Sequence, residues 1–219
     1  MPRQSHALQG ATPSRIAGTA LSIIDEDGPS ALSFRGVAER LGVSHATIFR
    51  RCSDLAGLLD LCADHLAAQL PDIAPDADWA RATETRFGAL YQLLTAHPGL
   101  ATLRGTRPWL GRELLARLTE PQIAANIAAG MSPRDAVATY RRMYLLTLGS
   151  AGFVDHRHPG AATAATRTAL APLDPSRFPV LTEHLDAVLA GMSDHEVYYG
   201  ALRQLIRAAV PTSTVARDS

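Results

Sequence analysis

The sequence lacks lysine altogether and holds few aromatic residues. Its 21 basic residues are all arginines and are matched by 21 acidic residues, so the formal net charge is zero, and aromatics make up only 5%. A balanced chain is not expected to coat nucleic acid with its whole surface, although a local basic patch remains open. With 219 residues, 47% of them hydrophobic, the chain can bury a full core and is not a disordered protein.

Cysteines and long apolar runs are equally scarce. Cys52 and Cys62 fit no disulfide or metal framework, and we expect both to be small buried hydrophobes in a reducing compartment. No run approaches the roughly 18 apolar residues that a membrane span needs. Residues 1–14 hold one arginine and lead into no apolar segment of the kind that a secretory signal contains. We therefore expect a cytoplasmic protein without a membrane partner.

Short catalytic motifs are missing too. GxSxG, HExxH, CxxC, the P-loop and GxGxxG do not occur, and the segment Gly-Ser-Ala-Gly at 149–152 lacks the spacing of a nucleophile elbow. The segment Asp-His-Arg-His at 155–158 brings two imidazoles together without a third spaced ligand, which favours a solvated loop over a metal site. We therefore expect no enzyme, no metal and no cofactor.

Alanine is abundant, and apolar residues recur at helical spacing along most of the chain. Capping residues, glycines and prolines delimit the expected helices. The pattern predicts helices through 16–24, 33–40, 44–50, 54–71, 79–96, 111–118, 121–129, 133–153 and 194–209, with a loop at 71–78 and an irregular or only partly helical stretch at 156–179. We therefore predict an all-α fold, with an N-terminal three-helix head and a larger helical body.

The head contains the parts of a helix-turn-helix, the motif that presents a short helix to the DNA major groove. Ala38 is small where the two helices cross, Gly42 allows a left-handed turn, and Val43 and Ile48 seat the second helix. Residues 32–54 hold four arginines against two acids. Small, hydrogen-bonding and cationic side chains are predicted to face outward from the second helix, as DNA contact requires.

These residues carry a family resemblance. The chain reads LSFRGVAERLGVSHATIFRRCSDLAGLL, and residues 16–59 resemble the DNA-binding domain of the TetR family of bacterial repressors, whose pattern is LSxRxVAxxLGVSxATLYRHFxxKxxLL. Four positions depart from it: Phe49 replaces a phosphate-contacting tyrosine, Arg51 a histidine, Cys52 a phenylalanine and Leu55 a phosphate-binding lysine. Arg50 and Arg51 are the candidates to compensate.

The DNA contacts expected from the motif and the resemblance fall into two groups. Arg50 and Arg51 are expected to contact phosphates, whereas Arg35, His45 and Thr47 are expected to reach base edges. The full set of candidate DNA-binding residues is Ser33, Arg35, Ser44, His45, Ala46, Thr47, Phe49, Arg50 and Arg51.

The remainder of the chain is similar to the regulatory domain of the tetracycline-repressor branch, in segments 103–108, 132–149 and 174–179. The resemblance implies a DNA-binding domain at 1–54 and an effector-binding and dimerisation domain at 55–219. That branch has a magnesium-binding histidine where Leu103 stands, and leucine cannot ligate a metal. The expected effector is therefore a metal-free, largely hydrophobic molecule with an anionic or hydrogen-bonding group that pairs with an arginine such as Arg104. The alternative is that Arg104 only caps the preceding turn and points to solvent. The candidate pocket residues are Arg86, Tyr91, Leu103, Arg104, Trp109, Tyr140, Met143 and Tyr144.

The resemblance also implies a homodimer, in which the helices at 133–153 and 194–209 meet their symmetry mates as a four-helix bundle. The candidate interface residues are Leu145, Leu148, Leu202, Leu205 and Ile206. The function it implies is a repressor that binds a palindromic operator in double-stranded DNA and is released by a small-molecule effector. An activator or a corepressor-dependent regulator of the same fold would have the same sequence features.

Overall fold

The computed structural model describes residues 11–74, 76–104, 111–153, 158–192 and 195–209, and within them it is helical and free of strands. The predicted all-α fold is confirmed. The helices are α2 (Pro13–Asp27), α3 (Phe34–Leu41), α4 (His45–Cys52), α5 (Leu55–Ala67), α6 (Trp79–Ala96), α7 (Pro98–Arg104), α8 (Arg112–Leu114), α9 (Glu120–Ala128), α10 (Pro133–Phe153), α11 (Pro159–Leu170), α12 (Pro179–Glu183), α13 (Leu185–Gly191) and α14 (His195–Ala209).

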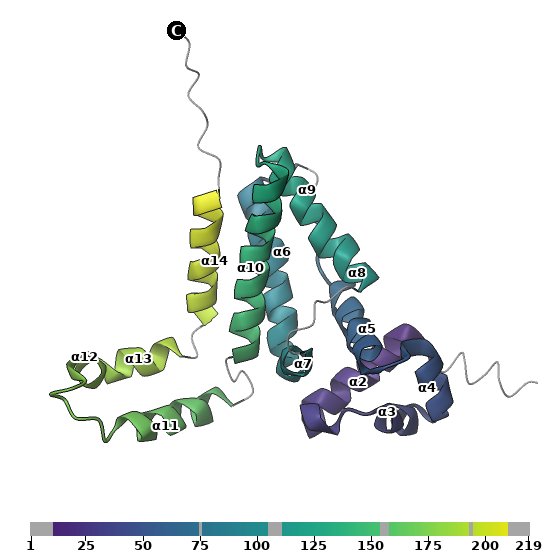
Figure 1. Ribbon diagram of the computed structural model, residues 1–219, viewed down its shortest axis with the longest axis horizontal. Helices are drawn as coiled ribbons and strands as arrows, with labels where there is room; N and C mark the ends of the chain where they lie inside the picture. Colours follow the sequence, from purple (N-terminus) through teal and green to yellow (C-terminus); the bar gives the residue numbers. More distant parts are fainter. Residues whose placement is uncertain (1–10, 75, 105–110, 154–157, 193–194, 210–219) are drawn as a thin grey trace, which may run out of the picture.

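The helices fall into a head, a body and a side arm (Figure 1). Helices α2, α3 and α4 form the head, and α5 packs on α2 and leads toward the body. In the body, α10 packs against α6, α9 and α14. The arm consists of α11, α12 and α13, which pack on one another and extend to the side away from the head.

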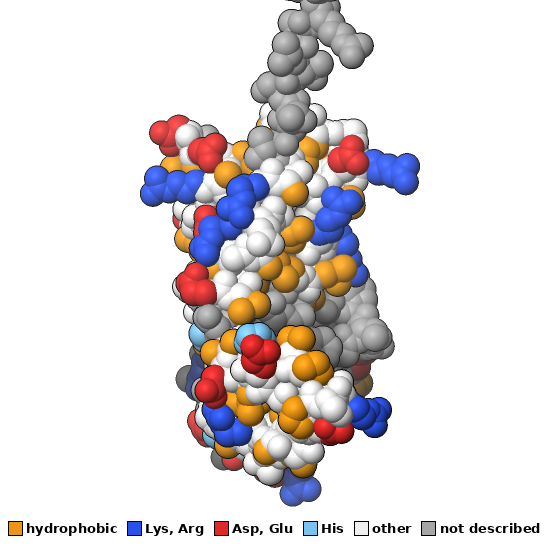
Figure 2. Space-filling model, turned by 90° about the vertical axis from the view of Figure 1, so that its left-hand side faces the viewer, with side chains coloured by type: hydrophobic (Ala, Val, Ile, Leu, Met, Phe, Trp, Pro, Cys, Tyr) orange, Lys and Arg blue, Asp and Glu red, His pale blue; other side chains and the backbone are white. Residues whose placement is uncertain are grey.

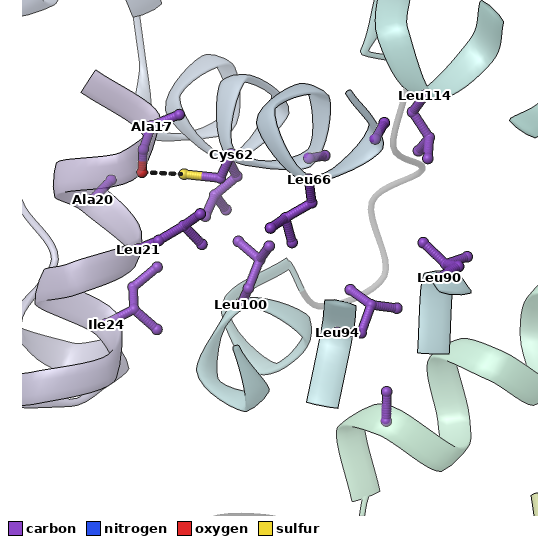
Figure 3. Packing of buried hydrophobic residues seen from close by; sticks show 14 of the residues in the cluster. Ala17, Ala20, Leu21, Ile24, Cys62, Leu66, Leu90, Leu94, Leu100 and Leu114 are labelled. Carbon is purple, nitrogen blue, oxygen red and sulfur yellow. Dashed lines mark hydrogen bonds between the residues drawn. The ribbon is translucent and has the colours of Figure 1, made fainter. Parts of the chain in front are cut away.

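One apolar core runs from the head into the body (Figure 3). Ala17 and Leu21 of α2 lie toward Cys62 and Leu66 of α5, and the same cluster continues into α6 through Leu94. The thiol of Cys62 donates a hydrogen bond of 3.9 Å to the carbonyl oxygen of Ala17, and burial raises its pKa to about 12. The expectation that both cysteines are buried is confirmed.

Local signals explain most helix ends. Thr12 accepts a hydrogen bond from the amide of Arg15 at the start of α2, and Asp78 does the same for Arg81 at the start of α6. A side-chain cap of this kind satisfies an amide that has no partner within the helix. The helix bounds expected from the sequence therefore hold to within a few residues over most of the chain.

Residues 156–179 were expected to be irregular or only partly helical, and the described part is partly helical: α11 occupies 159–170, an alanine-rich stretch with a proline in its first turn, and turns and coil follow to residue 178. One expectation for the body is wrong. The single helix expected at 111–118 is instead the short α8 followed by a π-helical segment, Leu115–Thr119. A π-helical turn holds one residue more than an α-helical turn, and helical spacing of apolar residues does not reveal it.

None of the helices in the described residues has both the length and the apolar character needed to cross a membrane.

Candidate nucleic-acid interface

The turn between α3 and α4 is built from local caps. Ser33 accepts a hydrogen bond of 3.1 Å from the amide of Gly36 at the start of α3. Gly42 ends that helix with φ 66° and ψ 32°, the left-handed conformation that glycine adopts without steric cost. The amide of Val43 then donates to the carbonyl oxygen of Ala38 at 3.0 Å, which closes the turn. The two helices are thus held in the predicted helix-turn-helix.

Helix α4 presents most of the predicted residues to solvent. Ser44 caps the helix by accepting from the amide of Thr47 at 3.2 Å. The side chains of Ser44, His45, Ala46, Phe49, Arg50 and Arg51 are exposed. A face with two guanidinium groups, short side chains and one exposed ring can contact both phosphates and base edges.

Thr47 is the exception to the outward-facing prediction. It is only 2% exposed, and its hydroxyl lies 2.9 Å from the hydroxyl of Ser44. The prediction that Thr47 faces outward is therefore wrong, because the hydroxyl is used inside the head to close the cap of α4. Thr47 has no accessible group that could make the contact with a base edge that was expected of it.

An aromatic cluster fixes the exposed side of α4 relative to α3. The Phe34 ring lies 5.8 Å from His45 and 6.3 Å from Phe49, and His45 stacks on Phe49 at 6.5 Å between ring centroids. Phe49 is nevertheless 53% exposed. The ring that replaces the tyrosine of the family pattern therefore helps to orient His45 and still offers an apolar surface.

The two arginines of α3 play different roles. Arg40 donates to Glu26 at 2.7 Å and to Asp27 at 2.6 Å, which ties α3 to the end of α2. Arg35 is exposed and pairs with Glu39 one turn further on, at 2.8 Å. The hydrogen bonds to these carboxylates are the main reason why the pKa values of Arg35 and Arg40 are both raised above the ordinary value. Arg35 can reach DNA only by exchanging the Glu39 carboxylate for another partner.

The turn between α4 and α5 relies on features that sequence reasoning missed. Ser53 has φ 60°, and the next residue, Asp54, caps α5 by accepting from the amide of Gly57 at 2.8 Å. A Cβ atom on Gly57 would collide with the carbonyl oxygen of Cys52. The family pattern had drawn attention to Leu55 in this stretch, whereas the glycine is what lets α5 approach the end of α4.

Two groups of hydrogen bonds, which we call the α5 latch, join α5 and the segment just after it to α8 and the π-helical segment. The carboxylate of Asp64 accepts hydrogen bonds of 2.9–3.2 Å from the amides of residues 112, 113 and 114 at the start of α8. Arg117 donates through Nη2 to the carbonyl oxygen of Leu70 at 2.7 Å and to Asp72 at 3.0 Å. These partners lie 45 to 50 residues apart, so no local sequence signal could have revealed them.

The predicted pocket residues of the body fall into three groups. Tyr91, Tyr140, Met143 and Tyr144 are buried against other side chains. Leu103 is half-buried and packs on the core, and Arg86 lines a cavity described below. Trp109 and the side chain of Arg104 lie outside the described residues. The structure thus brings most of the set into the body.

The buried tyrosines join three helices of the body. Tyr91 of α6 stacks on Tyr198 of α14 with 3.8 Å between centroids and contacts His195 at 3.0 Å. The Tyr198 hydroxyl donates to the carbonyl oxygen of Phe87 and lies 2.9 Å from the hydroxyl of Thr147 on α10. Burial raises the pKa of Tyr91 to about 12 and that of Tyr198 higher still.

The predicted dimer residues do not share one face. Leu202 and Ile206 are buried in the core of this chain, so the prediction that they face a second copy is wrong. Leu145 is 52% exposed, and Leu148 and Leu205 are half-buried. An amphipathic helix buries one apolar stripe, and the stripe of α14 packs on α6 and α10.

Within the described ranges, no three His, Cys, Asp or Glu side chains come together as a metal site would require. His156, considered above with its neighbours, lies outside these ranges.

Comparisons with known proteins agree with this geometry. Residues 70–206 match the family described as "Tetracyclin repressor-like, C-terminal domain". An "HTH-type transcriptional regulator" of Saccharopolyspora erythraea is 31% identical over 172 residues, which cover 77% of this chain and 71% of that protein. The "HTH-type transcriptional repressor DrrR1" of Streptomyces coeruleorubidus is 31% identical over 99 residues, covering 44% of this chain and 37% of that protein.

Solved structures show the same fold. Apo ActR from Streptomyces coelicolor superposes with a TM-score of 0.73 at 23% identity, covering 91% of this chain and 97% of that one. ActR in complex with actinorhodin gives a TM-score of 0.71 at 24% identity, with 91% and 95% coverage. Identities this low establish the arrangement of helices alone.

Proposed function

Because the chain belongs to the TetR family of transcriptional regulators, we propose that it is a homodimeric repressor whose affinity for DNA falls when a small-molecule effector binds. In this proposal, residues 1–54 read the DNA, and residues 55–219 bind the effector and form the dimer. The observation that carries it is the outer face of α4, where Arg50 and Arg51 are exposed and pair with no acid among the described residues. Guanidinium groups left free on a recognition helix are available for phosphates.

The docking follows from the exposure of the side chains. With α4 in the major groove, Arg50 and Arg51 contact phosphates, and His45 and Ala46 near its N-terminus lie closest to base edges. Arg35 joins them once it leaves Glu39, and that exchange costs little because both side chains of the pair are largely exposed to solvent.

The dimer is proposed to form on the exposed apolar residues of α10 and α14. Val137 and Leu145 on α10 and Val197 on α14 are each half or more exposed, and Leu205 adds a partly buried surface beside them. Figure 2 shows apolar side chains gathered along the face that carries α14. A twofold dimer built there reads an inverted repeat with its half-sites about one helical turn or a multiple of it apart.

The decisive experiment measures binding of the protein to the DNA upstream of its own gene by fluorescence anisotropy. Arg50→Ala/Arg51→Ala is expected to weaken binding to all sequences and to flatten the salt dependence by about two units, one for each phosphate contact. Arg81→Ala/Arg112→Ala, which removes two exposed arginines of the body, serves as the matched control and should bind as wild type. Equal binding by both double variants would refute the docking.

The sign of regulation is tested in the cell. Deletion of the gene should raise expression of a reporter placed behind the bound DNA, because the protein blocks transcription there. A fall in expression would show an activator instead.

A further inference from the structure

A cavity of about 320 Å³ lies where the segment after α5 passes α6 and the π-helical segment. Its apolar lining includes Pro71, Ile73 and Pro121, and its polar lining includes Arg86, Arg117 and Asp72. This volume suits a small ligand, and the wall, which is about equally polar and apolar, offers both an apolar surface and charged groups to it.

Both arginines line the cavity and have guanidinium donors that are not fully used. Arg86 donates through Nη1 to Gln122 at 3.2 Å, and burial lowers the pKa of its guanidinium. Arg117 uses Nη2 for Leu70 and Asp72, while its Nε is buried and has no hydrogen-bond partner among the described residues. A buried donor without a partner is costly, so a shift of the Arg117 side chain that brings Nε to a ligand acceptor would be favoured.

The acceptor that now faces Arg117 is easily replaced. Asp72 is 96% exposed and makes a single contact of 3.0 Å, and an exposed ion pair of this kind contributes little to stability. A ligand carboxylate offers the same two oxygens to the planar guanidinium fork, which binds carboxylates in a bidentate manner. An apolar body on that ligand would also cover the proline and isoleucine walls of the cavity.

We propose that this cavity binds the carboxylate of a small, mostly apolar organic acid between Arg86 and Arg117, displacing Asp72, and that binding there loosens the α5 latch. The inference rests on the proposed function, since it identifies the effector class and the site of regulation. The latch is suited to this role because Arg117 lies in the π-helical segment and holds Leu70, just beyond the end of α5. Helix α5 in turn packs on α2 of the DNA-reading head. Segments of π-helix are uncommon and occur often at functional sites.

The binding step is tested on the full chain without DNA. Calorimetric titration with benzoate, naphthalene-2-carboxylate and anthracene-2-carboxylate is compared with titration of the corresponding neutral amides. At least one carboxylate should bind at least tenfold more tightly than its amide. Arg86→Gln and Arg117→Gln should each weaken that binding tenfold or more, whereas Arg112→Gln, an exposed arginine of α8 outside the cavity, should change it less than twofold. Equal affinity for acids and amides, or no binding by any of the three acids below 1 mM, would overturn the proposal.

The regulatory step has a separate readout. The tightest-binding acid should accelerate hydrogen exchange at Gln69 and Leu70, whose amides close the turn after α5. It should also lower DNA affinity at least fivefold, and neither effect should appear in Arg86→Gln. Binding of the acid with unchanged exchange would overturn the latch. If the protein binds the acid but no DNA at all, the proposed repressor function fails while the carboxylate site stands.

Discussion

The cap that Asp64 provides for α8 can be tested by substituting the glycine beside it. Gly111 has φ −58° and ψ 144°, a conformation open to alanine, yet a Cβ atom there would collide with the Asp64 carboxylate. The glycine is therefore required by the carboxylate and not by the backbone. Gly111→Ala must push Asp64 away from the three amides that it accepts.

The magnitudes follow from the loss of a helix cap. Asp64→Ala should lower the free energy of unfolding by about 1–2 kcal/mol, the usual range for removing a capping side chain. Gly111→Ala should lower it by a similar amount, about 1–2 kcal/mol, because it displaces the same group. Once Asp64 is truncated the collision is gone, so the double variant should cost little more than Asp64→Ala alone. The coupling between the two sites is then about 1 kcal/mol or more.

Urea denaturation at one protein concentration measures the free energy of unfolding of the wild type, the two single variants and the double variant. Gly18→Ala is the control, because Gly18 lies within α2 with nothing within 4 Å of an added Cβ atom. That substitution should leave stability unchanged or raise it by up to about 1 kcal/mol. If the losses in free energy of unfolding of Gly111→Ala and Asp64→Ala simply add in the double variant, Gly111 is not needed to make room for the Asp64 cap.

Three other perturbations have expected outcomes. Gly57→Ala should lower the melting temperature by several degrees and weaken DNA binding, because its Cβ atom meets the carbonyl oxygen of Cys52; a wild-type melting curve would contradict this. Leu202→Asp should prevent folding, seen by circular dichroism, whereas Leu145→Asp should fold but sediment as a monomer; a stable Leu145→Asp dimer would exclude that face as the interface. Burial raises the thiol pKa values of Cys52 and Cys62 to about 11 and about 12, so their neutral forms stabilise the fold below pH 9, and this contribution is lost as the pH rises through 11 to 12. Urea denaturation of wild type should show the decline, and Cys62→Ala should show a smaller one.

The head was largely predictable from the sequence because its determinants are local. Ser33 and Ser44 lie three residues before the amides that they cap, and Gly42 marks the only turn between α3 and α4. Thr47 was assigned to the wrong side because a short hydroxyl side chain suits both a DNA-facing position and a cap. Only the structure shows that its hydroxyl is already engaged by Ser44.

The body was less predictable because its contacts join distant parts of the chain. Helix α14 carries apolar residues at helical spacing on more than one side, so the sequence could not tell Leu202, which faces its own core, from Val197, which is exposed. Asp64 and Arg117 look like ordinary surface charges until α8 is placed beside them. Caps and hydrogen bonds between residues so far apart in the sequence arise from tertiary packing, and no periodic pattern in the sequence indicates them.

The core shared by α2 and α5 limits how this protein can be recombined with its relatives. The apolar side of α2, including Ala17 and Leu21, is covered by Cys62 and Leu66, which follow the segment proposed to read DNA. A chimera joined at residue 54 would give the grafted head a foreign α5, and the side chains of the two surfaces would not interdigitate. A junction placed after Ala67 carries both sides of this contact together. The unit proposed to read DNA is thus smaller than the unit that can be transplanted.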